Sequence, residues 1–167
     1  GSKEKLYRTV WEHLTKAVHE PSYKAIRQGT DPEERLRQII AGRVRNAFDD
    51  GPGGRLRRLL NREMANPTQA HADIRNRFLR PLQELLTKTV ADFLGRHESD
   101  PVVLRCAFSV QSQLVTLARL RMKSHSDAIQ RLIGGNHPTP RQLDELTDHF
   151  TRFILAGLRG VASTERP

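Results

Sequence analysis

Apolar residues recur at three- and four-residue intervals along most of the chain, which is the spacing that one face of an α-helix presents to a core. Pro, Gly, Asn and Asp interrupt this pattern at intervals of helix length. No segment alternates apolar and polar residues over the length of a β-strand. The sequence therefore predicts about seven helices with short links, an all-α fold that is either a bundle or an orthogonal helix array.

The interruptions place the predicted helices at about residues 3–20, 32–48, 55–65, 66–95, 101–123, 126–133 and 139–161. Thr30 or Asp31 can cap the second of these helices, with Pro32 at its first position. Asp100 and Thr139 each precede a proline in the same way, so we expect them to begin the fifth and the last helix.

Two of the predicted helices have features that a simple amphipathic helix lacks. Pro81 lies inside the apolar pattern of residues 66–95, where it removes a backbone donor, so we expect a kink or a split there. The helix over residues 101–123 is apolar on more than one side. A broad apolar arc of this kind is buried against several neighbours or against a second chain.

The composition fits one globular domain over residues 1–167, with 37% hydrophobic and 28% charged residues and no internal repeat. We expect no membrane span, because no apolar run reaches the roughly 18–20 residues that cross a bilayer. The single cysteine, Cys106, excludes an internal disulfide. It lies in an apolar helix, where a small buried hydrophobic residue is its usual role.

The net charge of +9 and the sequence pI of about 10.6 leave two interpretations open. Such a charge can indicate an anionic partner, namely nucleic acid or a membrane surface. The basic residues are, however, spread along the chain and mixed with acids, which favours a solvated surface. Aromatic residues make up only 5% and do not alternate with the basic ones, which argues against a stacking platform for single strands.

The sequence carries none of the common catalytic or metal-binding motifs. Its glycines follow a helix rather than a strand, so they form no phosphate-binding loop. None of the seven histidines has the helical spacing of a zinc or di-iron site. Glu145 and His149 are four residues apart, and we interpret them as an exposed pair on one helix face. We therefore expect no enzyme activity, no metal and no cofactor.

The first residues carry a specific string, Gly1-Ser2-Lys3-Glu4-Lys5-Leu6-Tyr7, followed by Val10. This string resembles the junction that closes the DNA-binding domain of TetR-family repressors. Further strings resemble the CecR-like subgroup of that family, in the same order and spacing. They are Asn61–Thr68, Phe78–Leu82, Cys106–Gln113, His149-Phe150 and Phe153–Arg159.

The resemblance implies a TetR C-terminal-like bundle whose last two long helices pair with those of a second chain, which makes a homodimer. Gly157 supports this pairing. A Gly in the middle of a helix costs about 1 kcal/mol relative to Ala, and the close approach of another helix would explain why Gly stands at this position. A Gly tolerated inside the monomer core is the alternative. The predicted dimer interface contains Leu114, Val115, Phe150, Ile154, Gly157 and Leu158.

The resemblance also implies a ligand pocket among the middle helices. Polar groups beside an apolar stripe on kinked or crowded helices are the candidates for its lining. The predicted lining contains Trp11, Glu63, Met64, His71, Ile74, Arg75, Phe78, Leu82, Phe108 and Gln111. The alternative is an ordinary core with structural hydrogen bonds, for example an ion pair between Glu63 and an arginine.

TetR proteins begin with a helix-turn-helix domain, which this sequence lacks, so residues 1–20 are expected to be the linker helix that follows it. Operator DNA would then be contacted only through the absent domain. The resemblance implies the effector-binding and dimerisation domain of a bacterial, cytoplasmic transcriptional repressor. This domain would sense a small, mostly apolar molecule and control DNA binding allosterically. Two other classes stay open: a stand-alone basic helical protein-interaction module, and a sequence-blind nucleic-acid-binding module.

Overall fold

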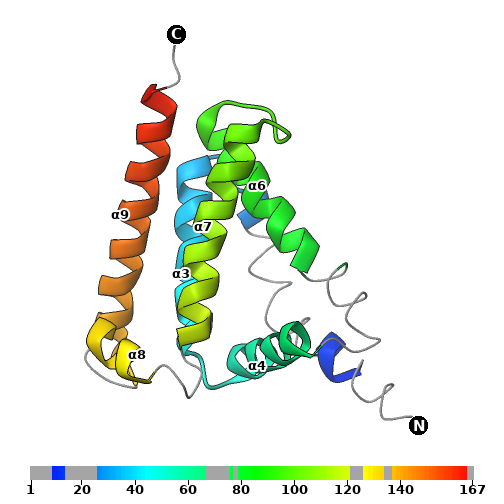
Figure 1. Cartoon of the computed structure of the whole chain (residues 1–167), viewed down its shortest axis with the longest axis vertical. Helices are drawn as coiled ribbons and strands as arrows, with labels where there is room; N and C mark the ends of the chain where they lie inside the picture. The colour runs from blue at the N-terminus through cyan, green and yellow to red at the C-terminus, as the bar shows by residue number, and fades with distance from the viewer. Residues whose placement is uncertain are drawn as a thin grey trace.

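The computed structural model describes residues 9–13, 26–66, 76, 79–120, 126–133 and 137–164. Within these ranges the chain is helical and contains no strand, which confirms the all-α prediction. The labelled helices are α3 (Pro32–Phe48), α4 (Pro52–Ala65), α6 (Arg80–Leu94), α7 (Pro101–Leu120), α8 (Ser126–Ile133) and α9 (Pro140–Thr164) (Figure 1). Residues 9–13, within the expected first helix, are helical too.

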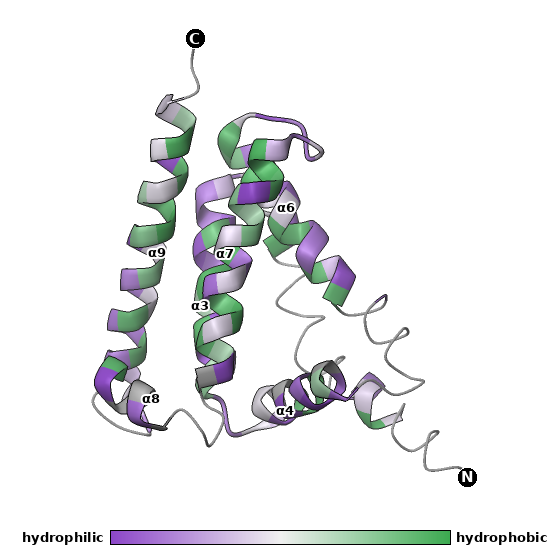
Figure 2. Ribbon diagram, viewed as in Figure 1, coloured by the Kyte–Doolittle hydropathy of each residue, from purple (hydrophilic) through white to green (hydrophobic). Residues whose placement is uncertain are grey.

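Helix α3 is the centre of the fold. It contacts α4, α6, α7 and α9, and α7 and α9 run beside it for most of its length (Figure 1). Its apolar stripe is buried as the periodicity predicted, with Leu36, Ile40 and Val44 fully inaccessible to solvent. Apolar residues also recur along the whole of α7 and α9 (Figure 2). The core therefore forms around α3, and the other helices cover it.

The helix starts follow the cap residues that the sequence indicated. The Asp31 carboxylate accepts hydrogen bonds from the backbone N–H groups of Glu33 and Glu34, at 3.1 and 3.3 Å. The Asp100 carboxylate accepts one from the N–H of Val102 at 2.8 Å. At α9, the Gln142 N–H donates to Thr139 Oγ1 at 3.3 Å while the Thr139 N–H donates to Gln142 Oε1 at 2.8 Å, which is a capping box.

The start of α4 corrects the sequence prediction, which placed it at about residue 55. The helix begins at Pro52, so the two glycines that follow belong to its first turn. The Asp49 carboxylate accepts hydrogen bonds from the N–H groups of Gly51 and Gly54, at 2.8 and 3.1 Å. A Cβ at Gly54 would lie 1.8 Å from the Asp49 carbonyl oxygen, so the close turn between α3 and α4 requires glycine there.

The interruption expected at Pro81 coincides with the start of α6. Pro81 lies in the first turn of α6, where its missing N–H leaves no helical hydrogen bond unmade. The helix ends at Gly95, whose positive φ of 65° and N–H bonds to Ala91 and Asp92 close the last turn. The earlier part of the predicted helix, apart from Asn76 and Leu79, lies outside the described residues.

Helix α7 spans Pro101–Leu120. Helix α8 spans Ser126–Ile133, as predicted. Judged by length and composition alone, the stretch Pro101–Arg119 could cross a membrane. This corrects the expectation that the chain contains no segment of that kind. Core helices of soluble proteins pass the same test. Val103, Ala107, Val110 and Leu114 in this stretch are buried in the core, which accounts for its hydropathy.

Candidate functional site

A groove separates α7 from α9. Both helices pack on α3, and the space between them has a volume of about 370 Å³. Its walls are mostly apolar, with one cationic side chain at the α7 edge. The lining includes Arg105, Cys106, Ser109, Phe153, Gly157 and Val161. Cys106 is buried, as predicted. The groove is therefore a concave, open surface on the long helices rather than an enclosed cavity.

Large apolar side chains lie exposed on these two helices. Leu104 and Phe108 are one turn apart on α7 and are 50% and 73% exposed. On α9, Phe153 is 61% exposed, and its ring stacks against that of His149 with ring centroids 6.3 Å apart. Single exposed apolar residues are common, but several on adjacent helices make this surface a candidate for contact with another molecule.

The predicted dimer-interface residues are divided between the core and this surface. Leu114, Ile154 and Leu158 are only 2–3% exposed and belong to the chain's own core. Val115 and Phe150 are half-buried. Gly157 is exposed, and a Cβ there would meet no heavy atom within 4 Å.

Leu104 and Phe153 are not among the predicted interface residues, and Phe108 is among the residues predicted to line the pocket. The broad apolar arc of residues 101–123 was the signal that one side of α7 lies outside the core. Periodicity alone did not say which side that is.

Among the predicted pocket residues, Trp11, Glu63 and Leu82 are buried, with exposed fractions of 2%, 1% and 8%. Phe108 instead lies on the exposed side of α7, so the structure does not bring it together with these buried residues. His71, Ile74, Arg75 and Phe78, and the side chain of Met64, lie outside what the structure describes.

Gln111 is a half-buried residue of α7 whose Oε1 atom is buried and has no hydrogen-bond partner. The Nε atom of Arg43 on α3 is in the same situation. Buried polar atoms are normally hydrogen-bonded, so such atoms in a folded domain call for a water molecule, an ion or a ligand. Neither the sequence pattern nor the helical period could have revealed Arg43, which is one of many arginines in the chain.

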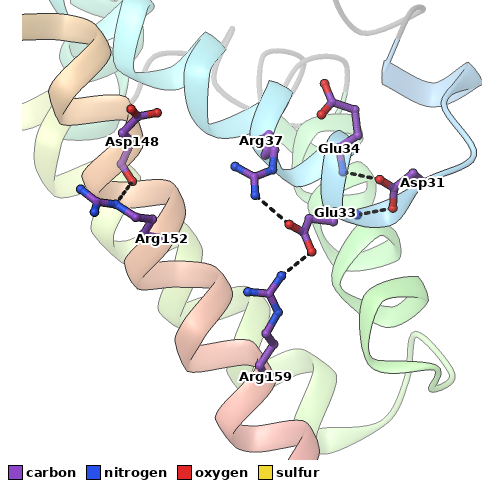
Figure 3. A network of polar contacts seen from close by, with 7 residues as sticks. All are labelled: Asp31, Glu33, Glu34, Arg37, Asp148, Arg152 and Arg159. Atoms are coloured by element: carbon purple, nitrogen blue, oxygen red, sulfur yellow. Dashed lines mark hydrogen bonds and ion pairs between the residues drawn. The ribbon is translucent and has the colours of Figure 1, made fainter.

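Ion pairs fix α3 to its neighbours. Glu33, near the start of α3, accepts hydrogen bonds from Arg37 Nη2 at 2.7 Å and from Arg159 Nη2 of α9 at 2.6 Å (Figure 3). The bond from Arg37, followed by that from Arg159, lowers the pKa of the Glu33 carboxyl below its usual range. On the other side of α3, Arg35 Nη2 lies 2.6 Å from Asp92 Oδ2 of α6.

Glu145 does not pair with His149 as the four-residue spacing suggested. Its Oε1 accepts a hydrogen bond from Arg141 Nε at 2.9 Å, and His149 contacts the rings of Phe150 and Phe153. In the part of the chain that the structure describes, no group of three or more His, Cys, Asp or Glu residues could hold a metal ion.

The comparison with known families decides the identity of the fold. A sequence model of the C-terminal domain of the HTH-type transcriptional dual regulator CecR matches residues 32–158. This chain belongs to the CecR C-terminal domain family. The match begins with α3 and ends within α9, so it includes most of the helical core described above. Among curated proteins, no sequence matches the chain.

Membership of the CecR C-terminal domain family confirms the resemblance to TetR-family regulators. The domain is a regulatory, ligand-binding type of domain from a transcription regulator, and its family is not one of enzymes.

Proposed function

We propose that this CecR-type domain is the effector-binding and dimerisation unit of a cytoplasmic, bacterial TetR-family transcriptional repressor. The effector would be a small, mostly apolar molecule that binds among the middle helices. The observation that carries this proposal is the buried Oε1 atom of Gln111 on α7, which has no hydrogen-bond partner, while Val110 and Leu114 beside it in the sequence belong to the apolar core. A ligand with a few polar atoms on an apolar body satisfies such a site.

Residues 1–20 would transmit the effector signal to a DNA-binding domain. Support comes from Trp11, which lies in the described helical turn of this segment and is only 2% exposed. A large buried side chain ties its segment to the residues that cover it, so the segment does not behave as a free linker. An effector that favours one of two helix packings would thereby change operator affinity.

A thermal-shift screen of apolar small molecules tests the effector proposal. A true effector at a hundred times its Kd stabilises the native state by about 2.7 kcal/mol, which for a domain of this size raises Tm by about 5–10 °C. Replacing Gln111 by Leu should weaken the binding of a polar-tipped hit about fivefold, by the loss of one hydrogen bond. Gln113→Leu on the same helix is the matched control, since Gln113 lines the α7–α9 groove instead.

A screen without any stabilising compound, or a hit whose affinity falls equally in both glutamine variants, contradicts the assignment of the effector site. The transmission step is tested separately in a protein that carries a helix-turn-helix domain before residue 1. Equal operator affinity with and without the bound hit would remove the allosteric mechanism.

Homodimerisation is proposed from the exposed apolar side chains of α7 and α9. Light scattering at micromolar concentration should give twice the chain mass of 19.0 kDa. A mass of one chain contradicts the proposal.

The high positive charge leaves a basic interaction module as the alternative. Arg37, Arg80, Arg96, Arg141 and Arg159 each pair with a carboxylate of the same chain. That pairing favours the solvated-surface interpretation. Strongly salt-dependent DNA binding by this domain alone would support the alternative.

A further inference from the structure

One side of α4 carries a row of arginines. Arg55, Arg58 and Arg62 are all exposed, and their spacing of three and four residues places them along the same side of the helix. Their Cα atoms extend over about 10 Å of the helix axis. A different side of α4 packs into the molecule through Leu56 and Glu63, which are only 2% and 1% exposed. The three guanidinium groups, called the α4 arginine row below, therefore face the solvent together.

The charge of the α4 arginine row is not compensated within the described part of the chain. The arginines named above as partners of carboxylates all lie on other elements. Among the described residues, no ion pair or hydrogen bond involves a side chain of the row. The one acid in the sequence of α4 is Glu63, and it is buried. The pairing that favours a solvated surface elsewhere thus does not extend to α4, and a polyanion can reach these charges.

The row has the chemistry and the length to bind phosphate groups on a rigid backbone. A guanidinium group can donate two parallel hydrogen bonds to a phosphate, which is why arginine recurs in nucleic-acid recognition. One DNA strand presents a phosphate charge about every 3.4 Å along the helix axis, so the row spans about three of them. An anionic membrane fits less well, since no large apolar side chain described on α4 is exposed and could insert between lipids.

The position of α4 in the fold also favours DNA. Helix α4 and the described turn of residues 9–13 lie at the same end of the molecule, away from the C-terminus (Figure 1). Under the proposed function, a DNA-binding domain precedes residue 1, so this end of the domain is the one nearer to the operator. The phosphates that flank the operator are then the polyanion closest to α4.

We propose that the α4 arginine row binds the phosphate backbone of duplex DNA and adds a contact that is independent of base sequence. The choice of DNA as the partner rests on the proposed function. Phosphate contacts add affinity and fix position but read no bases, so the row binds a duplex of any sequence. The basic-module alternative differs, because it draws on basic residues over the whole surface.

Fluorescence anisotropy of a labelled duplex of arbitrary sequence tests the proposal on this chain of 167 residues. For one α4 in contact, three phosphate contacts give a slope of about −2.7 in a plot of log K against the logarithm of salt concentration. The affinity should therefore fall about 40-fold between about 50 and about 200 mM salt. The triple variant Arg55→Gln, Arg58→Gln, Arg62→Gln should lose this binding. Glutamine is a good helix former, so the helical circular dichroism should be retained.

The matched control removes the same amount of charge elsewhere. Arg27, Arg105 and Arg131 are also exposed, the first before α3 and the others on α7 and α8. The triple variant Arg27→Gln, Arg105→Gln, Arg131→Gln has the same net charge as the α4 variant. It should keep its affinity for the duplex within about twofold, because salt screens distant exposed charges. An equal loss in both variants overturns the assignment to α4 and supports the basic module.

Two further results contradict the inference. A wild-type chain that does not bind the duplex at about 50 mM salt lacks the contact, whereas the effector screen described above still tests the proposed function on its own. Vesicles of phosphatidylserine and phosphatidylcholine probe the other source of phosphate groups. Binding to these vesicles that the α4 variant loses, without binding to the duplex, assigns the row to a membrane surface.

Discussion

Asp92→Asn is expected to destabilise the domain although Asp92 lies partly at the surface. The reason is its partner, Arg35, whose side chain is only 7% exposed and whose Nη2 lies 2.6 Å from Asp92 Oδ2. The Arg35 Nε atom is buried without a hydrogen-bond partner, so the carboxylate is the main compensation for a charge inside the fold. Without it, the guanidinium remains buried and uncompensated.

The magnitude follows from the burial of the two partners. Breaking a fully buried ion pair from one side costs about 3–5 kcal/mol, whereas an exposed pair contributes about 0–1 kcal/mol. Arg35 is nearly buried, but the Asp92 side chain is 38% exposed and water can reach the site. We therefore expect Asp92→Asn to lower the free energy of unfolding by about 2 kcal/mol, or Tm by about 4–8 °C.

Replacing both partners separates the buried charge from packing effects. The double variant Arg35→Met with Asp92→Asn removes the charge and keeps an unbranched apolar side chain against α6. Its unfolding free energy should return to within about 1 kcal/mol of that of the wild type. This recovery of the unfolding free energy distinguishes the buried charge from other causes. If the two substitutions acted independently, their losses of stability would add.

Denaturant unfolding followed by circular dichroism provides the measurement. The protein concentration must be the same for all variants, because the apparent stability of a dimer depends on it. Glu84→Gln is the control on the same helix, since Glu84 pairs with Arg80 at 2.8 Å while both side chains are more than half exposed. A loss for Asp92→Asn no greater than for Glu84→Gln, or a double variant weaker than Asp92→Asn alone, would refute the reasoning.

The remaining predictions concern local features of α3 and its ends. Asp31→Ala removes the N-cap of α3 and should lower the unfolding free energy by about 1 kcal/mol, whereas no loss would show that the cap contributes nothing. Gly42→Ala should raise Tm by about 2–4 °C, because the new Cβ meets open space. Gly54→Ala should lower Tm, because the new Cβ meets the Asp49 carbonyl. A Gly54→Ala variant that is more stable than the wild type would contradict the described turn. The pKa of Glu33 is lowered from 4.5 in the folded state, so its ionised form stabilises the fold above that pH and this contribution is lost as pH falls through the lowered pKa. The stability difference between wild type and Glu33→Gln should therefore shrink between about pH 6 and about pH 3, and a constant difference would count against the Arg37 and Arg159 contacts.

Helix boundaries were predictable where the signal is local. Asp31 before Pro32, Asp100 before Pro101 and Thr139 before Pro140 each begin a helix because cap and proline act within a few residues. The start of α4 was wrong by three residues, since it depends on the Asp49 carboxylate and on a close backbone approach at Gly54. No propensity scale contains such a contact.

The candidate surfaces were less predictable, because periodicity gives the apolar face of a helix but not the molecule it faces. Leu114, Ile154 and Leu158 satisfied the pattern of an interface, yet they pack in the chain's own core. Phe108 satisfied the pattern of a pocket and lies exposed on α7. The distinction requires the positions of α3 and α9 relative to α7, which only the folded chain supplies.

The central place of α3 has a consequence for synthesis of the protein. Arg159 of α9 bonds Glu33 of α3 across a sequence separation of 126 residues, and the two helices contact each other. An emerging chain therefore holds the apolar stripe of α3 uncovered on one side until α9 has left the ribosome. Folding during translation cannot be completed before that point, and until then the uncovered stripe is apolar surface of the kind that promotes aggregation.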